Sequence, residues 1–568
     1  MGHLLPIVSR RHRVAAAAIS VLALASCGSG AQTSSPAANH RGGTMTIVTS
    51  DPPGSVDTAL NYGTAWQELN ITNDGLTAYK KVAGAAGTTL VPDLATSLPT
   101  PSDGGKTYVF HVRSNVKYSD GTTFKPSDYL HVFERMFKVM GPATGPFYSN
   151  VVGAPSCLAT PATCSLSQGI TGDDSAHTLT FHLIAPDPEF FDKLALPFAF
   201  AVPPSAPNTD VGTSPLPGTG PYMWSQYIPN SMVKLVRNPN FQQWSADAQP
   251  AGNPDVIIYK FGTPIESEVT EVENAQADWV ASTTGIPSDR LNELSTSHAS
   301  QIHVSPATAI YYMAMNTHVA PFDNPMVRQA VNFATDRAAL VKLFGGPKLA
   351  SPSCQILPPN FPGYVPYCPY TANAASGGHG QWTGPDLAKA QQLVSQSGTA
   401  GQAVTIVNPT TPLGQSTGQY FKDLLTSLGY KATAQYLAPP VQDPYIKNSS
   451  HKAQIGLSIW FQDYQAPSDF LNVLTGCGAF QPNNDNQPNI SEFCDQTIQS
   501  QMDSAETREA TDRSAANQLW SKVDRAVTDQ APMVVMYNPN VLDFLAKRVG
   551  NYEYNPQWGF LVDQAWVV

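Results

Sequence analysis

Apolar residues follow strand and helix periods along most of the chain, with no repeat of fixed length. Residues 44–49 are typical of a strand, and in 107–112 three apolar residues, Tyr108, Phe110 and Val112, alternate with the residues between them. Asn324 is placed to cap a helix that runs from Pro325 to Val341, and a second helical stripe covers 516–527. Mixed strands and helices predict an α/β or α+β fold of several lobes.

Composition changes this picture in two ways. The 568 residues are 42% hydrophobic and include 49 prolines, which indicates several domains with many fixed turns. The proline-rich segments 203–217 and 360–384 are the candidate breaks between domains. The net charge is −11, which excludes a nucleic-acid-binding protein because such a protein needs a basic face.

The N-terminus has the pattern of an export signal. Arg10, Arg11 and Arg13 precede an apolar run over 14–25 that is too short to span a bilayer. The run ends in Leu-Ala-Ser-Cys, which resembles a bacterial lipobox and makes Cys27 the predicted site of lipidation. Ordinary cleavage near a small residue is the alternative, and the export route, general secretory or twin-arginine, stays open.

The other six cysteines fall into three local couples. Fifteen pairings are possible, and nearest-neighbour disulfides are the simplest because each couple lies in a loop-rich segment. No couple has C-x-x-C spacing or a histidine cluster beside it, so we expect no metal and no cofactor. The predicted pairs are Cys157 with Cys164, Cys354 with Cys368, and Cys477 with Cys494.

Two short motifs suggest catalysis but lack the required context. Residues 105–107 match only the end of a phosphate-binding loop, because Thr100 stands where its first glycine is needed. Residues 414–418 satisfy G-x-S-x-G, with Ser416 as the nucleophile of a secreted serine esterase. The preceding strand candidate ends too early for the sharp turn that this motif requires, so a glycine-rich start of a helix is the preferred interpretation.

Four ordered blocks resemble the large bacterial extracellular solute-binding family 5, the receptors of oligopeptide, dipeptide and nickel ABC importers. The first block, in three parts, is LVPDLA at 90–95, TYVFHVR at 107–113 and VKYSDGT at 116–122. The others are PGTGPY at 217–222 with RNP at 237–239, then MNT at 315–317 with VRQA at 327–330 and DR at 336–337, and IWFQDYQAP at 459–467.

This resemblance implies an α/β, two-lobed, type II periplasmic-binding-protein (Venus-flytrap) fold with an extra domain inserted in lobe one. Arg328 and Asp336 are expected on exposed flanks of the helix that starts at Pro325, in packing roles rather than as ligand contacts. The expected organisation is a signal peptide at 1–27, a flexible tether at 28–41, lobe one at 42–75, 206–300 and 536–568, the inserted domain at 76–205, and lobe two at 301–535.

The segment 459–467 resembles the W-x-x-D-Y-x-x-P element of the family's peptide receptors. There the aspartate, Asp463 in this chain, pairs with the α-ammonium of the peptide, and such a desolvated carboxylate favours ligands with a free N-terminus. Trp460, Phe461 and Tyr464 are the expected apolar walls. The alternative is an aromatic strand that packs within lobe two, with Asp463 as a loop acid.

The resulting hypothesis is a lipid-anchored, monomeric receptor on the extracytoplasmic face of the cell membrane. It is expected to bind peptides by closing two lobes and to deliver them to the permease subunits of an ABC importer, without being an enzyme. A nickel chelate or an oligosaccharide is the alternative solute on the same fold, and an esterase that uses Ser416 is the remote alternative.

Overall fold

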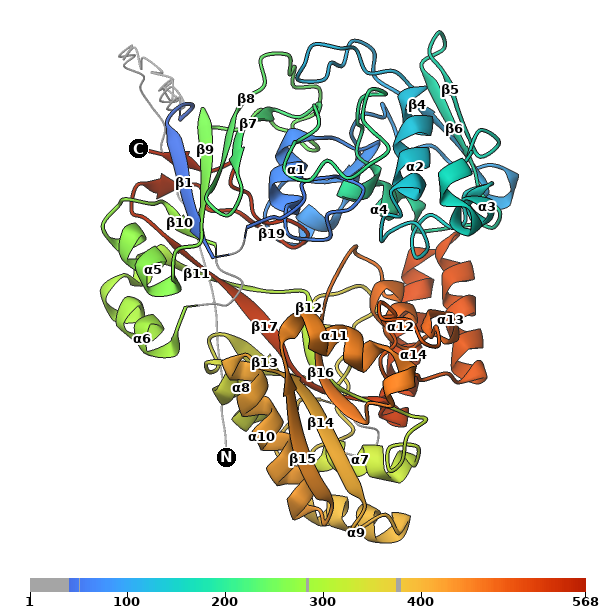
Figure 1. Ribbon diagram of the computed structural model, residues 1–568, viewed down its shortest axis with the longest axis vertical. Coiled ribbons are helices and arrows are strands. Elements are labelled where there is room, and N and C mark those ends of the chain that lie inside the picture. Colours follow the sequence, from blue (N-terminus) through green and yellow to red (C-terminus); the bar gives the residue numbers. More distant parts are fainter. Residues whose placement is uncertain (1–39, 51, 282–285, 374–379) are drawn as a thin grey trace, which may run out of the picture. The chain divides into compact units, whose positions relative to one another are not determined.

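Among the residues that the structure describes, twelve strands form one mixed sheet (Figure 1). The long strand β17 (Met533–Leu545) joins its two halves, because it pairs antiparallel with β12 (Ala309–Met315) and with β10 (Trp279–Val280). The order across the sheet is β15 (Lys431–Leu437), β14 (Ala403–Pro409), β16 (Ile455–Phe461), β12, β17, β10, β1 (Thr44–Thr49), β9 (Val256–Phe261), β8 (Met232–Arg237) and β7 (Tyr222–Ile228), and β11 (Ile302–Pro306) and β13 (Ala350–Pro352) also pair with β17.

The computed structural model describes residues 40–50, 52–281, 286–373 and 380–568, and residues 40–568 form one compact unit. The signal peptide, Cys27 and nearly all of the predicted tether lie outside these ranges. No helix within them is both long and apolar enough to cross a membrane. The lobe and insert boundaries given above stay predictions.

The first half of the sheet consists of β1 and β7 to β10. The strand predicted over 44–49 is confirmed as β1, which pairs parallel with β9 from Thr44↔Val256 to Thr49↔Phe261. Two helices, α5 (Ile265–Glu273) and α6 (Ser288–Ser297), follow β9 in the chain. Two short antiparallel strand pairs follow β17 in the chain: β18 (Val549–Gly550) with β21 (Trp566–Val567), and β19 (Tyr554–Asn555) with β20 (Gly559–Phe560).

Between β1 and β7 lies a separate region with its own aromatic core, which we call the small-sheet region (residues 77–199). The predicted alternation is confirmed in β4 (Thr107–His111), where Tyr108 and Phe110 are buried and Val109 and His111 are exposed. The remaining elements around this region are α1 (Trp66–Thr72), β2 (Thr77–Tyr79), β3 (Leu90–Pro92), α2 (Asp128–Lys138), α3 (Ala154–Ala159), β5 (Ile170–Asp173), β6 (Thr178–His182) and α4 (Phe190–Leu194).

The second half of the sheet, β12 and β14 to β16, is flanked by helices. The helix predicted over 325–341 begins as expected, since the Asn324 side chain accepts from Met326 N, but it is two helices. α7 (Pro325–Ala334) ends before Asp336, whose Oδ1 accepts from Ala339 N at 3.0 Å and so caps α8 (Arg337–Phe344).

The expectation that Arg328 and Asp336 lie on the exposed flanks of one helix is therefore wrong. Asp336 lies at the break between two helices, and Arg328 is buried. The Arg328 guanidinium donates to the carbonyl oxygens of Phe322 at 2.8 Å and Gln530 at 2.9 Å. These two carbonyl acceptors, one of them far away in the sequence, make burial of its charge possible.

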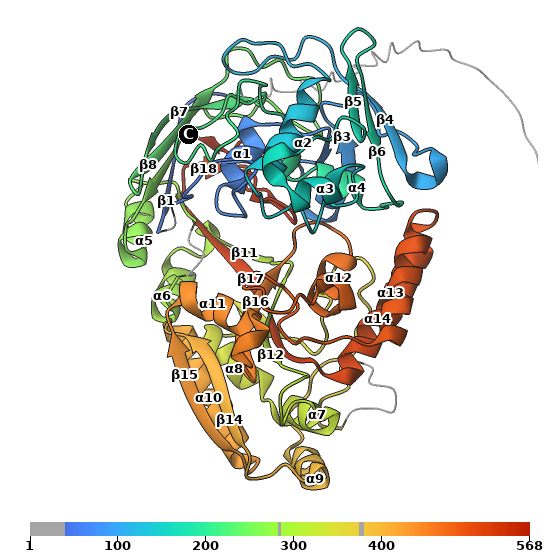
Figure 2. The ribbon, with the colours of Figure 1, turned by 45° about the vertical axis from the view of Figure 1, so that its right-hand side comes forward.

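The predicted C-terminal helix is confirmed as α14 (Arg513–Gln530), whose buried residues include Trp520 and Val523. It lies beside α13 (Gln496–Glu509) in both ribbon views (Figures 1 and 2). The other helices of this half are α9 (Leu387–Ser397), α10 (Pro412–Ser427), α11 (Pro439–Lys447) and α12 (Ser468–Thr475). The three cysteine couples are bonded as nearest neighbours: Cys157–Cys164, Cys354–Cys368 and Cys477–Cys494.

Candidate functional site

One edge of strand β16 lacks a strand partner over its second half. β16 pairs with β12 along its whole length, whereas β14 pairs with it only at Ile455 and Gly456. From Leu457 to Phe461 no described strand pairs with the other edge. An open strand edge presents backbone donors and acceptors to any extended chain that approaches it.

The direction of these backbone groups follows from two hydrogen bonds. The N–H of Leu457 donates to Asn408 Oδ1 at 3.2 Å, and its carbonyl accepts from Gln442 Nε2 at 3.0 Å. The backbone N–H and C=O of Leu457 therefore point away from β12, toward the edge that lacks a strand partner. Backbone direction alternates along an antiparallel strand. Ile459 and Phe461 therefore present their N–H and C=O groups at the same open edge.

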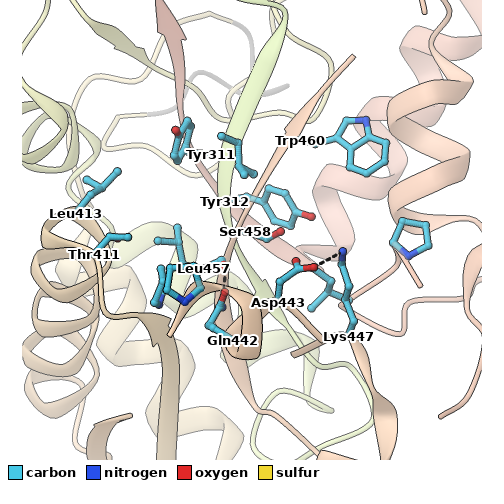
Figure 3. A pocket seen from close by; sticks show the side chains of 15 residues that line it. Tyr311, Tyr312, Thr411, Leu413, Gln442, Asp443, Lys447, Leu457, Ser458 and Trp460 are labelled. Carbon is cyan, nitrogen blue, oxygen red and sulfur yellow. Dashed lines mark hydrogen bonds and ion pairs between the residues drawn. The ribbon is translucent and has the colours of Figure 1, made fainter. Parts of the chain in front are cut away.

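A cavity of about 330 Å³ lies along this edge (Figure 3). Paired residues of an antiparallel sheet share a face, so Tyr312, Ser458 and Trp460 lie on one face and Tyr311 and Ile459 on the other. The cavity thus extends around both faces of the strand edge. Its remaining lining residues are Pro409, Thr411, Leu413, Pro439, Gln442, Asp443, Lys447, Leu457, Pro488 and Ile490.

Helix α11 brings an ion pair to the wall on the Trp460 side. Lys447 Nζ donates to Asp443 Oδ2 at 2.6 Å, one helical turn apart (Figure 3). The Asp443 side chain is 50% exposed and that of Lys447 22%. This wall therefore combines aromatic surface with opposite charges that neutralise each other.

Asp463 follows β16 and is buried. Tyr62 OH, from the loop before α1, donates to its Oδ2 at 2.5 Å. The Asp463 carbonyl accepts from Gln557 Nε2 at 2.7 Å, which fixes the backbone from a third part of the chain. Burial is the main cause that raises the pKa of Asp463 to about 7, while the hydrogen bond from Tyr62 opposes the rise.

A second buried acid, Asp469, lies in the first turn of α12. Its Oδ2 accepts from Asp463 N at 2.8 Å, and its Oδ1 has no hydrogen-bond partner among the described residues. Burial and the nearby Asp463 raise the pKa of Asp469 well above its ordinary value. Within the described ranges neither carboxylate forms an ion pair with a lysine, arginine or histidine of the chain. The pair is a desolvated acidic site that a cation would stabilise.

Tyr464 points in another direction and joins the core of the small-sheet region. Its hydroxyl donates to Glu189 Oε2 at 3.1 Å, and its ring meets that of Phe147 edge-on at 5.7 Å. Ser468 also donates to Glu189. We call this set of contacts the junction, because it attaches the segment after β16 to the small-sheet region.

Charged groups extend the junction to α14. Arg513 Nη2 donates to Asp192 Oδ2 at 2.9 Å, which links α14 to α4. Burial raises the pKa of Glu189 to about 8, and Lys193 opposes this rise. Burial raises the pKa of Asp192 as well, although Arg513 opposes it.

The four residues expected to bind a ligand are thus not all in one place. Trp460 lines the cavity, Phe461 is 53% exposed, Asp463 is buried beside Tyr62, and Tyr464 is in the junction. Four further residues of the candidate site were not predicted as ligand contacts from the sequence: Tyr62, Asp443, Lys447 and Asp469. Asp469 had a local signal, since it lies six residues after Asp463, but nothing near Tyr62 in the sequence pointed to it.

The G-x-S-x-G match is part of a helix. Ser416 lies within α10, and its hydroxyl donates to the Pro412 carbonyl at 2.8 Å. The other members of the triad considered for the esterase alternative are His451 and Asp443. His451 Nδ1 is 3.1 Å from the Tyr445 carbonyl, and Asp443 pairs with Lys447. These two residues thus have other partners than a triad would require.

Metal ligands do not gather in the part of the chain that the structure describes. It contains no group of three or more histidine, cysteine, aspartate or glutamate residues placed to hold an ion. The six cysteines of the described ranges are all in disulfides.

Two sheet halves joined by β17, with a cavity at an open strand edge, define a two-lobed binding-protein fold, and solved structures share it. A structure described as clavulanic acid biosynthesis oligopeptide binding protein 2 superposes with a TM-score of 0.83 at 23% identity, covering 93% of this chain and 96% of that one. The Escherichia coli murein tripeptide binding protein gives 0.73 at 21% identity, with 92% and 98% covered. The predicted α/β, two-lobed type II fold is confirmed.

The chain belongs to the bacterial extracellular solute-binding proteins, family 5. The family model, described as "Bacterial extracellular solute-binding proteins, family 5 Middle", matches residues 89–482. It is 24% identical to di/tripeptide-binding protein 1 of Pseudomonas aeruginosa (strain UCBPP-PA14) over 504 residues, 83% of this chain and 84% of that protein. It is 24% identical to the periplasmic oligopeptide-binding protein of Escherichia coli (strain K12) over 453 residues, 76% of each. The family predicted from the sequence blocks is confirmed, and its members are solute-binding proteins.

Proposed function

We propose that this protein captures peptides between its two lobes and delivers them to the permease subunits of an ABC importer. One observation carries the proposal: the open edge of β16 leads directly to the buried acid Asp463. An extended peptide added to that edge bonds through its backbone to Ile459 and Phe461, whatever its side chains are. The names of the relatives, which include di/tripeptide-, oligopeptide- and glutathione-binding proteins, support the same solute class.

The acid selects for a free N-terminus. Asp463 is desolvated, and its carboxylate accepts from the neutral hydroxyl of Tyr62 rather than from a cation of the described residues. An α-ammonium supplies the missing positive charge through a charge-assisted hydrogen bond. The unpartnered Oδ1 of Asp469 offers the ammonium a second acceptor nearby.

Calorimetry with free and N-acetylated peptides tests this site. We expect Asp463→Asn to weaken binding of a free peptide by about 2 to 5 kcal/mol, or about 30-fold to several thousand-fold, because the ammonium loses its counter-ion while the shape is kept. N-acetylation should weaken binding to the parent protein for the same reason. Asp423→Asn is the matched control, since Asp423 is exposed on α10 and accepts from Gln419 Nε2.

Equal affinity for free and acetylated peptides, or an Asp463→Asn variant as tight as the parent, would place the ligand elsewhere. A nickel chelate or an oligosaccharide would then be the solute to test. We also propose that the protein is not an enzyme; hydrolysis of generic esters that Ser416→Ala abolishes would contradict this.

We propose that Cys27 carries a lipid that holds the protein, as a monomer, on the extracytoplasmic face of the membrane. The sequence that supports this is the lipobox-like Leu-Ala-Ser-Cys. One acylated residue supplies attachment that no helix of the described residues provides. Cys27→Ala should release the protein from membranes or leave it unprocessed, and unchanged fractionation and mass would refute the anchor.

A further inference from the structure

The cavity beside β16 has two chemically different walls, one on each face of the strand edge. On one face lie Leu413, Ile459 and Tyr311, which are mainly apolar. On the other lie Trp460 and Tyr312 with the Asp443–Lys447 ion pair. Figure 3 shows Leu413 on the opposite side of the strand from Asp443 and Lys447.

We propose that these walls read two neighbouring side chains of a bound peptide, and that Asp443 is the residue that determines specificity on one of them. The inference rests on the proposed function, because it requires a peptide on the β16 edge. Successive side chains of an extended chain point to opposite faces. One side chain therefore meets the Leu413 wall, and its neighbour meets the Asp443 wall.

The Leu413 wall favours an aliphatic side chain. Leu413 is partly buried at the start of α10, where the Thr411 side chain accepts from Gly414 N and fixes the first turn. An apolar side chain placed there removes its own surface and that of Leu413 from water. No ionised group lines this face of the cavity among the described residues.

The Asp443 wall favours an aromatic side chain that carries a hydrogen-bond donor, as in tyrosine or tryptophan. Trp460 and Tyr312 supply ring surface, and aromatic pairs gain from offset or edge-on contact. The half-exposed carboxylate of Asp443 accepts from the donor. Lys447 balances the charge of Asp443, so a ligand side chain that is itself charged gains little.

Binding of tripeptides tests this assignment. Each position of trialanine is replaced in turn by tyrosine, phenylalanine or leucine, and affinity is measured by calorimetry. At one position we expect the tyrosine peptide to bind about tenfold tighter than the phenylalanine peptide. This ratio is at the low end for a hydrogen bond to a charged group, because the Asp443 side chain is half exposed. The ratio should fall close to one in Asp443→Ala and be intermediate in Asp443→Asn, which keeps an acceptor.

Leu413→Ala separates the two walls. It should weaken the preference for leucine at a neighbouring position and leave the tyrosine-to-phenylalanine ratio unchanged. Asp423→Asn, on the exposed side of α10, should change neither preference. A merely structural role of Asp443 would lower affinity for all peptides alike.

The inference is overturned if tripeptides bind but the tyrosine-to-phenylalanine ratio is the same in the parent and Asp443→Ala. It is overturned as well if Leu413→Ala and Asp443→Ala alter preference at the same position. Failure of the proposed function looks different, since then no tripeptide binds the parent protein at all.

Discussion

The open edge of β16 and the junction that follows it are only a few residues apart, yet they do different things. Trp460 lines a cavity, and the backbone groups of its neighbours Ile459 and Phe461 have no strand partner on the open edge. Tyr464, four residues later, is buried in the core of the small-sheet region and donates to Glu189. One segment therefore contributes to the candidate site on one side and to the junction on the other.

Asp463 stands between these two regions. Its side chain faces Tyr62, while its backbone N–H is held by Asp469 at the start of α12. Trp460 and Tyr464 thus lie in different surroundings although they belong to one motif. Changes at the edge should alter affinity, whereas changes in the junction should alter stability, and the predictions that follow test that division.

The largest effect is expected for Tyr464→Ala. Removing a buried aromatic ring leaves a cavity and should lower the free energy of unfolding by about 3 to 5 kcal/mol, measured by denaturant titration. Tyr464→Phe keeps the ring and loses only the bond to Glu189, so it should cost about 1 kcal/mol. Equal stability of Tyr464→Ala and the parent would contradict the structural role of the junction.

Opening the Cys477–Cys494 bond should lower stability by about 3 kcal/mol. The bond closes a loop between α12 and α13 with a sequence separation of 17, and the chain-entropy model gives that magnitude. Paired Cys→Ser replacement should lower the melting temperature but leave peptide affinity at the β16 edge unchanged. Free thiols at these positions in unreduced peptide maps would refute the bond.

Acid should weaken peptide binding through Asp463. Its pKa of about 7 means that the carboxylate takes up a proton as pH falls below 7, so a peptide ammonium must displace that proton. The ionised fraction falls from about one half at pH 7 to about one hundredth at pH 5, so affinity should fall about 50-fold over that range. Asp463→Asn should remove most of this slope; a slope unchanged in that variant would assign it to other groups.

Stability of the ligand-free protein should depend on pH with the opposite sign. A raised pKa means that the folded carboxyl holds its proton more tightly than the unfolded one, so the free energy of unfolding falls as pH rises toward 7. Glu68 and Glu506, both with a pKa raised by burial to about 7, add to the same trend.

The smallest effect is expected for Trp460→Phe. Trp460 Nε1 has no hydrogen-bond partner among the described residues, so the change removes ring area without leaving a polar group unpaired. We expect affinity for peptides to fall only a few-fold and the free energy of unfolding to change by less than about 1 kcal/mol. A stability loss as large as that of Tyr464→Ala would erase the distinction between edge and junction.

Local sequence signals predicted much of the fold. Alternation in β4 and the Asn324–Pro325 helix start depend on neighbouring residues, and both are confirmed. The prediction of a single helix over 325–341 was wrong. Asp336 caps a second helix, whose apolar residues continue the spacing of the first, so the pattern did not show the break. The prediction that Arg328 is exposed failed for a different reason. Its acceptor, the Gln530 carbonyl, lies 202 residues away in the sequence, so no local pattern showed that the buried guanidinium has a partner.

The same limit applied to the site. The motif around Asp463 predicted an acid next to an aromatic strand, and Asp463 is buried two residues after the end of β16. Its partner Tyr62 is 401 residues away, so no local pattern reveals the contact. Periodicity also could not show that β14 stops pairing with β16 at Gly456, and that register creates the open edge.

Strand β17 has a consequence for how the chain acquires its shape. It pairs with β10 and β11 of one half and with β12 and β13 of the other, although it begins at Met533, close to the C-terminus. Contacts between such distant segments form slowly, since a long loop must close first. A chain that emerges N-terminus first therefore cannot join its two halves until β17, which follows all four of these strands, is available. Until then, the strands that β17 covers are exposed edges on which a chaperone, or another copy of the chain, could pair.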